Sequence, residues 1–181
     1  MGSLTLVSAA EGTLSWEPAD RHTELLAAPV AEAVASTPTA RVAAIDPTLA
    51  DTAAFCAAYG SPPEHSANCV VVAGRRAGEV RYAAVLVLAS ARADINGAVR
   101  RHLDVRKISF APQDDAVSLT GMEFGGITPI GLPTGWPVLI DEAVVAAGEV
   151  VIGSGLRASK LLVASDDLAA LPTAEVLPLA L

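Results

Sequence analysis

The residues best suited to chemistry in this chain of 181 residues lie between Gly121 and Glu142. This segment holds a glycine pair, a Thr-Pro step and a further glycine, followed by an apolar run that ends at Asp141. Glycine lets the main chain approach a ligand closely, and proline fixes the path of a turn. The pattern predicts a recognition loop beside a strand whose terminal carboxylate faces the same small pocket.

A pocket lined by main chain can hydrolyse an activated ester without a strong nucleophile. Orienting a water molecule and stabilising a developing oxyanion with amide groups lower the barrier. The sequence has no Gly-x-Ser-x-Gly elbow, no Walker lysine loop and no Gly-x-Gly-x-x-Gly segment after a strand. Hydrolase triads, nucleoside triphosphatases and dinucleotide enzymes therefore lose their usual sequence support.

Metal and redox chemistry have little support. The three histidines are scattered and lack the spacing of a metal site, and Cys56 and Cys69 form no Cys-x-x-Cys pair. We expect no metal site and no cofactor, and we interpret both cysteines as buried thiols.

The elements that position these residues predict a single α/β domain. Its sheet is expected to be mixed, mostly antiparallel and curved, with helices on its faces, because hairpins and short crossovers disfavour a doubly wound parallel sheet. Apolar runs predict strands at residues 41–45, 69–73, 79–88, 107–110, 137–140, 149–152 and 160–163. Capping residues and periodicity predict helices at residues 23–35, 51–59, 94–102, 112–120 and 166–170. Residues 1–40 are expected to form an N-terminal extension that packs on a domain of residues 41–181.

Composition indicates a globular protein whose core is built from small aliphatic side chains, since 52% of the residues are hydrophobic and only 4% are aromatic. The apolar run from Tyr82 to Ala91 is too short to cross a bilayer, and the N-terminus lacks the basic start of a secretory signal. We therefore expect a cytoplasmic protein without a membrane partner.

The charge is unevenly distributed along the chain. The formal net charge is −8, yet residues 75–107 hold eight basic and three acidic side chains, so the remainder carries −13. A local basic face on an acidic protein can hold a few phosphates while the overall field suppresses binding to bulk nucleic acid. The alternative is that these arginines are the solvated sides of a hairpin and a helix.

Several segments together resemble the YbaK/EbsC family, the stand-alone relatives of the editing domain inserted in bacterial prolyl-tRNA synthetases. They span about two thirds of the chain, from Pro62 to Val176. The matching segments are residues 66–72 (SANCVVV), the Thr-Gly step at 120–121, the loop at 125–131 (GGITPIG), the strand end at 139–141 (LID), the turn at 152–155 (IGSG) and residues 164–168 (ASDDL). The combination of the loop with the downstream Ile-Asp is the most specific part of the likeness.

The resemblance implies a trans-acting deacylase that hydrolyses the ester between a mischarged small amino acid and tRNA. Its partner would be the aminoacyl-tRNA 3′ end, with a homodimer left open. It implies that the glycine-rich loop forms a wall of the aminoacyl pocket and that the aspartate after the strand positions the substrate. The alternative for Asp141 is a strand-end cap whose carboxylate bonds to the local backbone. The implied catalytic residues are Asn68, Gly126 and Asp141, and the implied substrate-binding residues are Gly125, Ile127, Thr128, Pro129, Gly153, Ser154 and Gly155.

One position departs from the family pattern. Family deacylases typically carry a lysine in the strand where this chain has Asn68, so a neutral amide replaces a cation. Asn68 could orient water or hydrogen-bond a carbonyl, and Lys107, Arg157 and Lys160 are the candidates to supply the charge from elsewhere. His65, close by in the sequence, is a weaker candidate for a general base.

Two further functions stay open. The protein could be a binding module that retains the pocket without cleaving its ligand, or a hydrolase of another small acyl ester.

Two aromatic side chains, Phe124 and Trp136, flank the loop and could line the pocket, although core packing is the commoner fate of such aromatic side chains.

Overall fold

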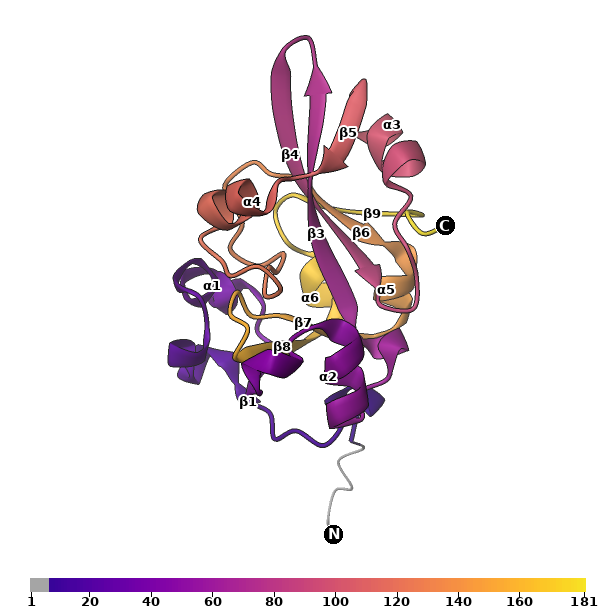
Figure 1. Cartoon of the computed structure of the whole chain (residues 1–181). Coiled ribbons are helices and arrows are strands. Elements are labelled where there is room, and N and C mark those ends of the chain that lie inside the picture. The colour runs from indigo at the N-terminus through magenta and orange to yellow at the C-terminus, as the bar shows by residue number, and fades with distance from the viewer. Residues whose placement is uncertain (1–6) are drawn as a thin grey trace.

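Two β-sheets organise residues 7–181, the part of the chain that the computed structural model describes (Figure 1). The smaller sheet has the strand order β1-β2-β8-β7, and the larger has the order β5-β3-β4-β6-β9. The strands are β1 (Glu17–Pro18), β2 (Arg41–Ala44), β3 (Ala67–Arg76), β4 (Glu79–Leu88), β5 (Lys107–Phe110), β6 (Val138–Asp141), β7 (Glu149–Gly153), β8 (Ser159–Ala164) and β9 (Ala174–Leu177). A single bridge between Ser66 and Val151 joins the two sheets.

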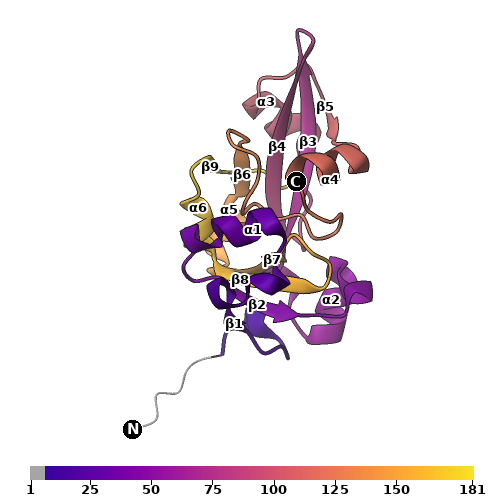
Figure 2. The same cartoon turned by 90° about the vertical axis from the view of Figure 1, so that its left-hand side faces the viewer.

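Short helices surround the sheets (Figures 1 and 2). The α-helices are α1 (Ala28–Ala33), α2 (Thr52–Tyr59), α3 (Arg100–His102), α4 (Gln113–Thr120), α5 (Glu142–Ala146) and α6 (Ser165–Ala169). The 3-10 helices are Ala9–Glu11, Ala19–Arg21, Thr23–Leu25, Val34–Ser36, Pro47–Leu49 and Pro63–His65, and Ile95–Val99 is a π-helix. In residues 7–181, no helix is long and apolar enough to cross a membrane.

The predicted fold class is confirmed. Most strand pairs are antiparallel, and the mixed character comes from β6, which pairs in parallel with both β4 and β9. The structure differs from the prediction in one respect, because the strands divide between two sheets rather than forming one. Pairing between strands far apart in sequence decides this division, and local periodicity carries no signal for it.

The hairpin of β3 and β4 is longer than predicted. Its turn is formed by Ala77 and Gly78 alone, both with positive φ (50° and 81°), which is the two-residue geometry that matches the twist of the flanking strands. Gly74 therefore lies within β3, where a Cβ atom would come within 2.7 Å of the Val105 side chain. The hairpin projects well beyond the rest of the molecule (Figure 1).

The single helix predicted over residues 23–35 is wrong. The chain forms a 3-10 turn, an extended residue at Leu26 and then α1, which has Pro29 in its first turn. Proline lacks an N–H group and so fits the first turn of a helix rather than its interior. The other predicted helices and strands are present within a few residues of their expected bounds, whereas β1, β9 and α5 were not predicted.

The main core lies between the two sheets and includes side chains from before residue 40. Leu26, Val30 and Val34 are buried there with Leu86, Ile140 and Leu161. A second cluster packs the π-helix and α3 segment on the other face of the larger sheet, and a third packs α2 on the smaller sheet. The two sheets and α2 thereby hold fixed the walls of the site described next.

Candidate functional site

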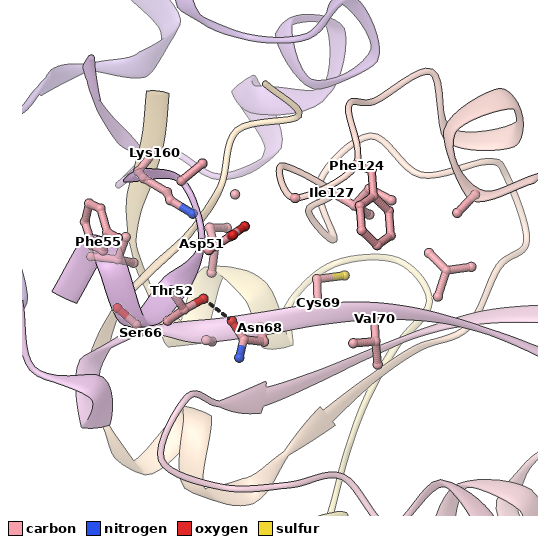
Figure 3. Close-up of a pocket in the computed structure, with 18 of the residues that line it drawn as sticks. Asp51, Thr52, Phe55, Ser66, Asn68, Cys69, Val70, Phe124, Ile127 and Lys160 are labelled. Carbon is pink, nitrogen blue, oxygen red and sulfur yellow. Dashed lines mark hydrogen bonds between the residues drawn. The ribbon is translucent and has the colours of Figure 1, made fainter. Parts of the chain in front are cut away.

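A cavity of about 500 Å³ opens between the first half of β3 and the ends of β7 and β8 (Figure 3). Its walls come from five segments that are far apart in the sequence. They are Ala50, Asp51, Thr52 and Phe55 around the start of α2; Ser66 and the first residues of β3, Ala67 to Val71; Phe110, Ala111, Gln113 and Ala116 around the start of α4; Phe124, Gly125 and Ile127 of the loop; and Val151, Ile152, Gly153 and Lys160 of the smaller sheet. The volume falls in the range of small-molecule sites.

The edge of β3 is open where it borders this cavity. The neighbouring strand β5 pairs only with Val72 to Arg75, and the Val71 carbonyl accepts a hydrogen bond from Ala111 at 2.9 Å. Main-chain groups of alternate strand residues face the same side, so the N–H and C=O groups of Cys69 face the cavity as well. The cavity thus has a wall of main chain, although β3 supplies it rather than the glycine-rich loop.

Lys160 is the one lysine or arginine among the described residues that line the cavity. It lies on the central strand β8 of the smaller sheet, opposite Ala43 of β2 and Gly153 of β7, and is 8% exposed. Its Nζ atom is 5.4 Å from the centre of the Phe55 ring. Burial, helped by the nearby Arg157 cation, lowers the pKa of Lys160 to about 8.

Asp51 and Arg157 lie at the entrance. The Nη1 atom of Arg157 donates hydrogen bonds to Asp51 Oδ1 and to the Phe124 carbonyl, both at 3.4 Å. Its Nη2 atom donates to the Pro47 carbonyl at 3.2 Å. Gly125 makes room for this guanidinium, since a Cβ atom there would collide with Arg157 Nη1. Asp51 is the single carboxylate among the described lining residues, and its side chain is 78% exposed.

Asn68 borders the cavity with a fixed orientation. Thr52 Oγ1 donates a hydrogen bond of 2.5 Å to Asn68 Oδ1, which leaves the amide nitrogen as the group that can donate to a ligand. Asn68 and Cys69 project from opposite sides of β3, with Lys160 on the Cys69 side (Figure 3). Asn68 and Lys160 therefore reach different parts of the site.

Cys69 lines the cavity but is not a nucleophile at neutral pH. Burial raises the pKa of its thiol to about 12, so the thiolate is not populated. The prediction that both cysteines are buried is wrong in one respect: Cys56 and Cys69 are each partly exposed, and Cys69 borders the cavity because it lies on the strand that forms the cavity wall.

The structure brings four of the predicted site residues together. Asn68, Gly125, Ile127 and Gly153 all line the cavity. Phe124 lines it too, whereas Trp136 stacks on Tyr82 with ring centres 5.2 Å apart, away from the cavity.

Other residues of the predicted loop and turn support the site from behind. The Gly126 N–H donates a hydrogen bond to the Glu123 carbonyl at 2.9 Å, so this N–H is not free to bind an ester. The Gly126 carbonyl accepts a hydrogen bond from the Gly155 N–H at 2.7 Å. Ser154 is fully buried, with its hydroxyl bonded to Ser159.

The two remaining loop residues also lie outside the cavity lining. Thr128 is fully buried, and its hydroxyl has no partner within residues 7–181. Pro129 borders a different groove, near Trp136. The loop therefore borders the cavity through Phe124, Gly125 and Ile127 and not through Thr128 or Pro129.

Asp141 is placed differently from the prediction. Its carboxylate is 2% exposed and accepts hydrogen bonds from the main-chain N–H groups of Ala143, Leu179 and Ala180 at 2.7 to 3.1 Å. It is not among the lining residues, because the strand that ends at Asp141 lies on the far side of β4 from the cavity. The expected contact of Asp141 with a substrate ammonium is therefore corrected: Asp51 is the carboxylate at the site.

Two further candidates are also placed elsewhere. His65 Nδ1 is 3.2 Å from the Glu149 carbonyl and is outside the lining, and Lys107 lies on the exposed part of β5. Of the three cations that could replace a lysine at position 68, Lys160 is the one that reaches the cavity. The sequence feature that could have singled out Lys160 is its position in an apolar run that forms a strand. In residues 7–181, no group of three or more His, Cys, Asp or Glu side chains could hold a metal ion.

Comparisons with known proteins agree with this architecture. A family model described as the aminoacyl-tRNA editing domain matches residues 46–171. A solved structure described as a candidate trans-editing enzyme for prolyl tRNA synthetase aligns with a TM-score of 0.73 at 22% identity, covering 92% of this chain and 99% of that one. A hypothetical protein aligns with a TM-score of 0.74 at 23% identity, covering 84% and 99%.

A more distant solved structure is a candidate signal transduction protein from Marinobacter aquaeolei. It has a TM-score of 0.57 at 17% identity, and the alignment covers 84% of this chain and 30% of that one. At these identities the structural likeness shows the fold alone. The search of curated proteins finds no match to the sequence.

Proposed function

Because the chain belongs to the family of aminoacyl-tRNA editing domains, we propose that it is a trans-acting deacylase that hydrolyses the ester of a mischarged small amino acid on tRNA. The observation that carries the proposal is a cavity with one buried cation, Lys160, beside an open strand edge. A cytoplasmic location, where tRNA is charged, follows from this proposal.

Lys160 stabilises the negative charge that develops during ester cleavage. A water oxygen adds to the ester carbonyl carbon, the carbonyl oxygen becomes negative, and the bond to the ribose oxygen then breaks. The ribose oxygen leaves with the proton that the water gives up. A buried ammonium acts on the oxyanion more strongly than a solvated one, because little water screens it.

The other polar groups of the cavity hold the substrate. Asp51 at the entrance accepts the α-ammonium group of the amino acid, in exchange for its contact with Arg157. The Asn68 amide nitrogen and the main-chain N–H of Cys69 donate to the ester or the ribose. Gly125 and Ile127 form the facing wall, where side-chain bulk limits the size of the amino acid.

The test is deacylation of tRNAs charged with small amino acids, including Ala-tRNA(Pro) and Cys-tRNA(Pro). We expect Lys160→Met to lower kcat by about a hundredfold or more, the usual effect of removing an oxyanion-stabilising group. The matched control is Leu162→Met, which changes a buried side chain on the same face of β8 without changing charge.

The pH dependence gives a second readout. The protonated form of Lys160 is the active one, so the rate above the uncatalysed background should fall as pH rises through about 8, the pKa of Lys160. Because the Arg157 cation lowers that pKa, Arg157→Ala should move the midpoint to higher pH.

Three results would count against the proposal. Tight binding of aminoacyl-tRNA with no turnover on any member of the panel would indicate a binding module. Equal activity on free aminoacyl esters would indicate a hydrolase that makes no use of the tRNA body. Full activity of Lys160→Met would remove Lys160 from the mechanism.

A further inference from the structure

The projecting β3–β4 hairpin, β5 and α3 lie together in one part of the molecule (Figures 1 and 2). These elements and the residues next to them carry most of the basic side chains of this acidic protein. We call this part, residues 75–81 and 100–107, the basic arm. It carries seven exposed cations: Arg75, Arg76, Arg81, Arg100, Arg101, Arg106 and Lys107. Its acidic residues are Glu79 and Asp104, so its net charge is +5 in a chain of −8.

Most of these cations are not neutralised within the described protein. Arg76 pairs with Asp104, and Arg81 lies 4.0 Å from Glu79. The other five make no ion pair within residues 7–181; they are Arg75, Arg100, Arg101, Arg106 and Lys107. Three acidic side chains lie on neighbouring elements. Asp114 and Asp115 of α4 are exposed, and Glu175 of β9 contacts the arm through His102, 2.6 Å from the His102 Nε2 atom.

Arg75 and Lys107 are the most informative pair. They are direct cross-strand partners in the antiparallel pair of β3 and β5, so their side chains lie on the same face of the sheet. Like charges in this arrangement destabilise a sheet unless an anion lies over them. The pair therefore indicates a surface that is used with an anionic partner.

The same face leads to the cavity. Side chains alternate along a strand, so Arg75 and Cys69 lie on the same side of β3, about 20 Å apart at about 3.4 Å per residue. On β5, the strand itself runs from Lys107 toward the cavity and ends at Phe110, which borders the cavity although its side chain alternates to the opposite face. A ligand with its reactive end in the cavity and phosphates at intervals along an extended chain would cover this path.

We propose that the basic arm docks the phosphate backbone of the tRNA body, with Arg75 and Lys107 at its centre, while the single-stranded 3′ end runs along β5 into the cavity. The inference rests on the proposed function and assigns a binding surface to the tRNA body, the part of the substrate outside the cavity. The acidic remainder of the protein repels nucleic acid elsewhere, so binding is confined to the orientation that delivers the ester to Lys160.

The experiment measures binding of uncharged tRNA by fluorescence anisotropy at several salt concentrations. We compare the wild type with the double variant Arg75→Ala/Lys107→Ala. The matched control is Arg21→Ala/Arg92→Ala, which removes two exposed arginines outside the arm and changes the net charge equally. Loss of two phosphate contacts should weaken binding by on the order of tenfold and reduce the slope of log Kd against log salt by about 1.5, while the control stays near wild type.

Two outcomes would overturn the inference. One is equal weakening in the arm variant and the control, which would mean that only net charge matters. The other is competition by an acidic peptide as effective, charge for charge, as competition by tRNA, which would assign the arm to a protein partner. Because the tRNA is uncharged, the result stands whether or not the protein hydrolyses an ester.

With aminoacyl-tRNA as substrate, the arm variant should raise KM and leave kcat close to wild type. Cleavage of an aminoacyl-adenosine, which lacks the tRNA body, should be equal in the two proteins. A failed deacylase proposal would show as no cleavage of either substrate, and a failed docking proposal as unchanged KM.

Discussion

At the scale of single residues, Lys160 links the chemistry of the site to the stability of the fold. A lysine on the central strand of a sheet loses hydration, and the structure offers it the ring of Phe55 rather than a carboxylate in direct contact. This loss of hydration lowers the pKa of Lys160 from 10.5 to about 8. A residue kept at such a cost is better explained by a role in the cavity than by packing.

This cost predicts that Lys160→Met stabilises the protein at pH 7 by up to about 3 kcal/mol, the equivalent of the lowered pKa. In the unfolded chain the lysine keeps its ordinary pKa, so between pH 8 and 10.5 the unfolded state binds the extra proton. The penalty is therefore complete below pH 8 and disappears as pH rises toward 10.5. Urea denaturation at pH 7 and pH 10 measures it.

The gain in stability of Lys160→Met should be smaller at pH 10 than at pH 7. The control Leu162→Met should show no gain at either pH. A gain that does not change with pH would mean that packing, rather than charge burial, sets the difference.

At the scale of elements, Asp141 shows how one side chain joins three segments. It ends β6, caps the N-terminus of α5 through the Ala143 N–H, and holds the C-terminal segment through Leu179 and Ala180. A carboxylate after an apolar strand has the same sequence signature whether it faces a ligand or caps a helix. The tertiary contacts with residues nearly forty positions away distinguish the two.

We predict that Asp141→Ala lowers the free energy of unfolding by on the order of 3 kcal/mol, because it leaves buried main-chain N–H groups without an acceptor. Thermal or urea denaturation measures the loss. Asp115→Ala, which removes an exposed carboxylate from α4, is the control and should change stability little.

Deacylation by Asp141→Ala at a temperature where it is fully folded should keep the wild-type KM. A large rise in KM with unchanged stability would instead return Asp141 to the substrate site.

At the scale of the whole molecule, the residues before the family match are part of the packing. β1 pairs with β2, and Leu26, Val30 and Val34 lie in the core shared by both sheets. The Ser159 hydroxyl, next to Lys160, donates to the Leu25 carbonyl at 2.5 Å. The boundary at residue 40 stays a prediction, and the contacts on both sides of it lead to a test.

Deletion of residues 1–40 should abolish cooperative unfolding, because it uncovers apolar side chains of β8 and removes β1, one of the two strands that pair with β2. Circular dichroism during heating, together with near-ultraviolet spectra, measures the effect. A truncated chain that melts at the wild-type temperature would show that residues 1–40 are a dispensable extension.

The sequence by itself determined the class of the fold and most of its elements, although not β1, β9 and α5. Strands such as β5 and helices such as α4 follow from apolar runs, caps and glycine stops, because these signals act over a few residues. The glycine-rich loop was likewise recognisable as part of the site from its residue types and spacing, whereas Asn68 was assigned to the site only by the resemblance to the editing-domain family.

Only the tertiary structure decided how the strands divide into two sheets and which charged groups meet in the cavity. Lys160 and Asp51 lie more than a hundred residues apart in the chain, and their approach depends on the pairing of β8 with β2 and β7 and on the packing of α2. The same long-range packing took Asp141 away from the site. Such long-range contacts depend on how the whole molecule packs, so no local pattern in the sequence predicts them.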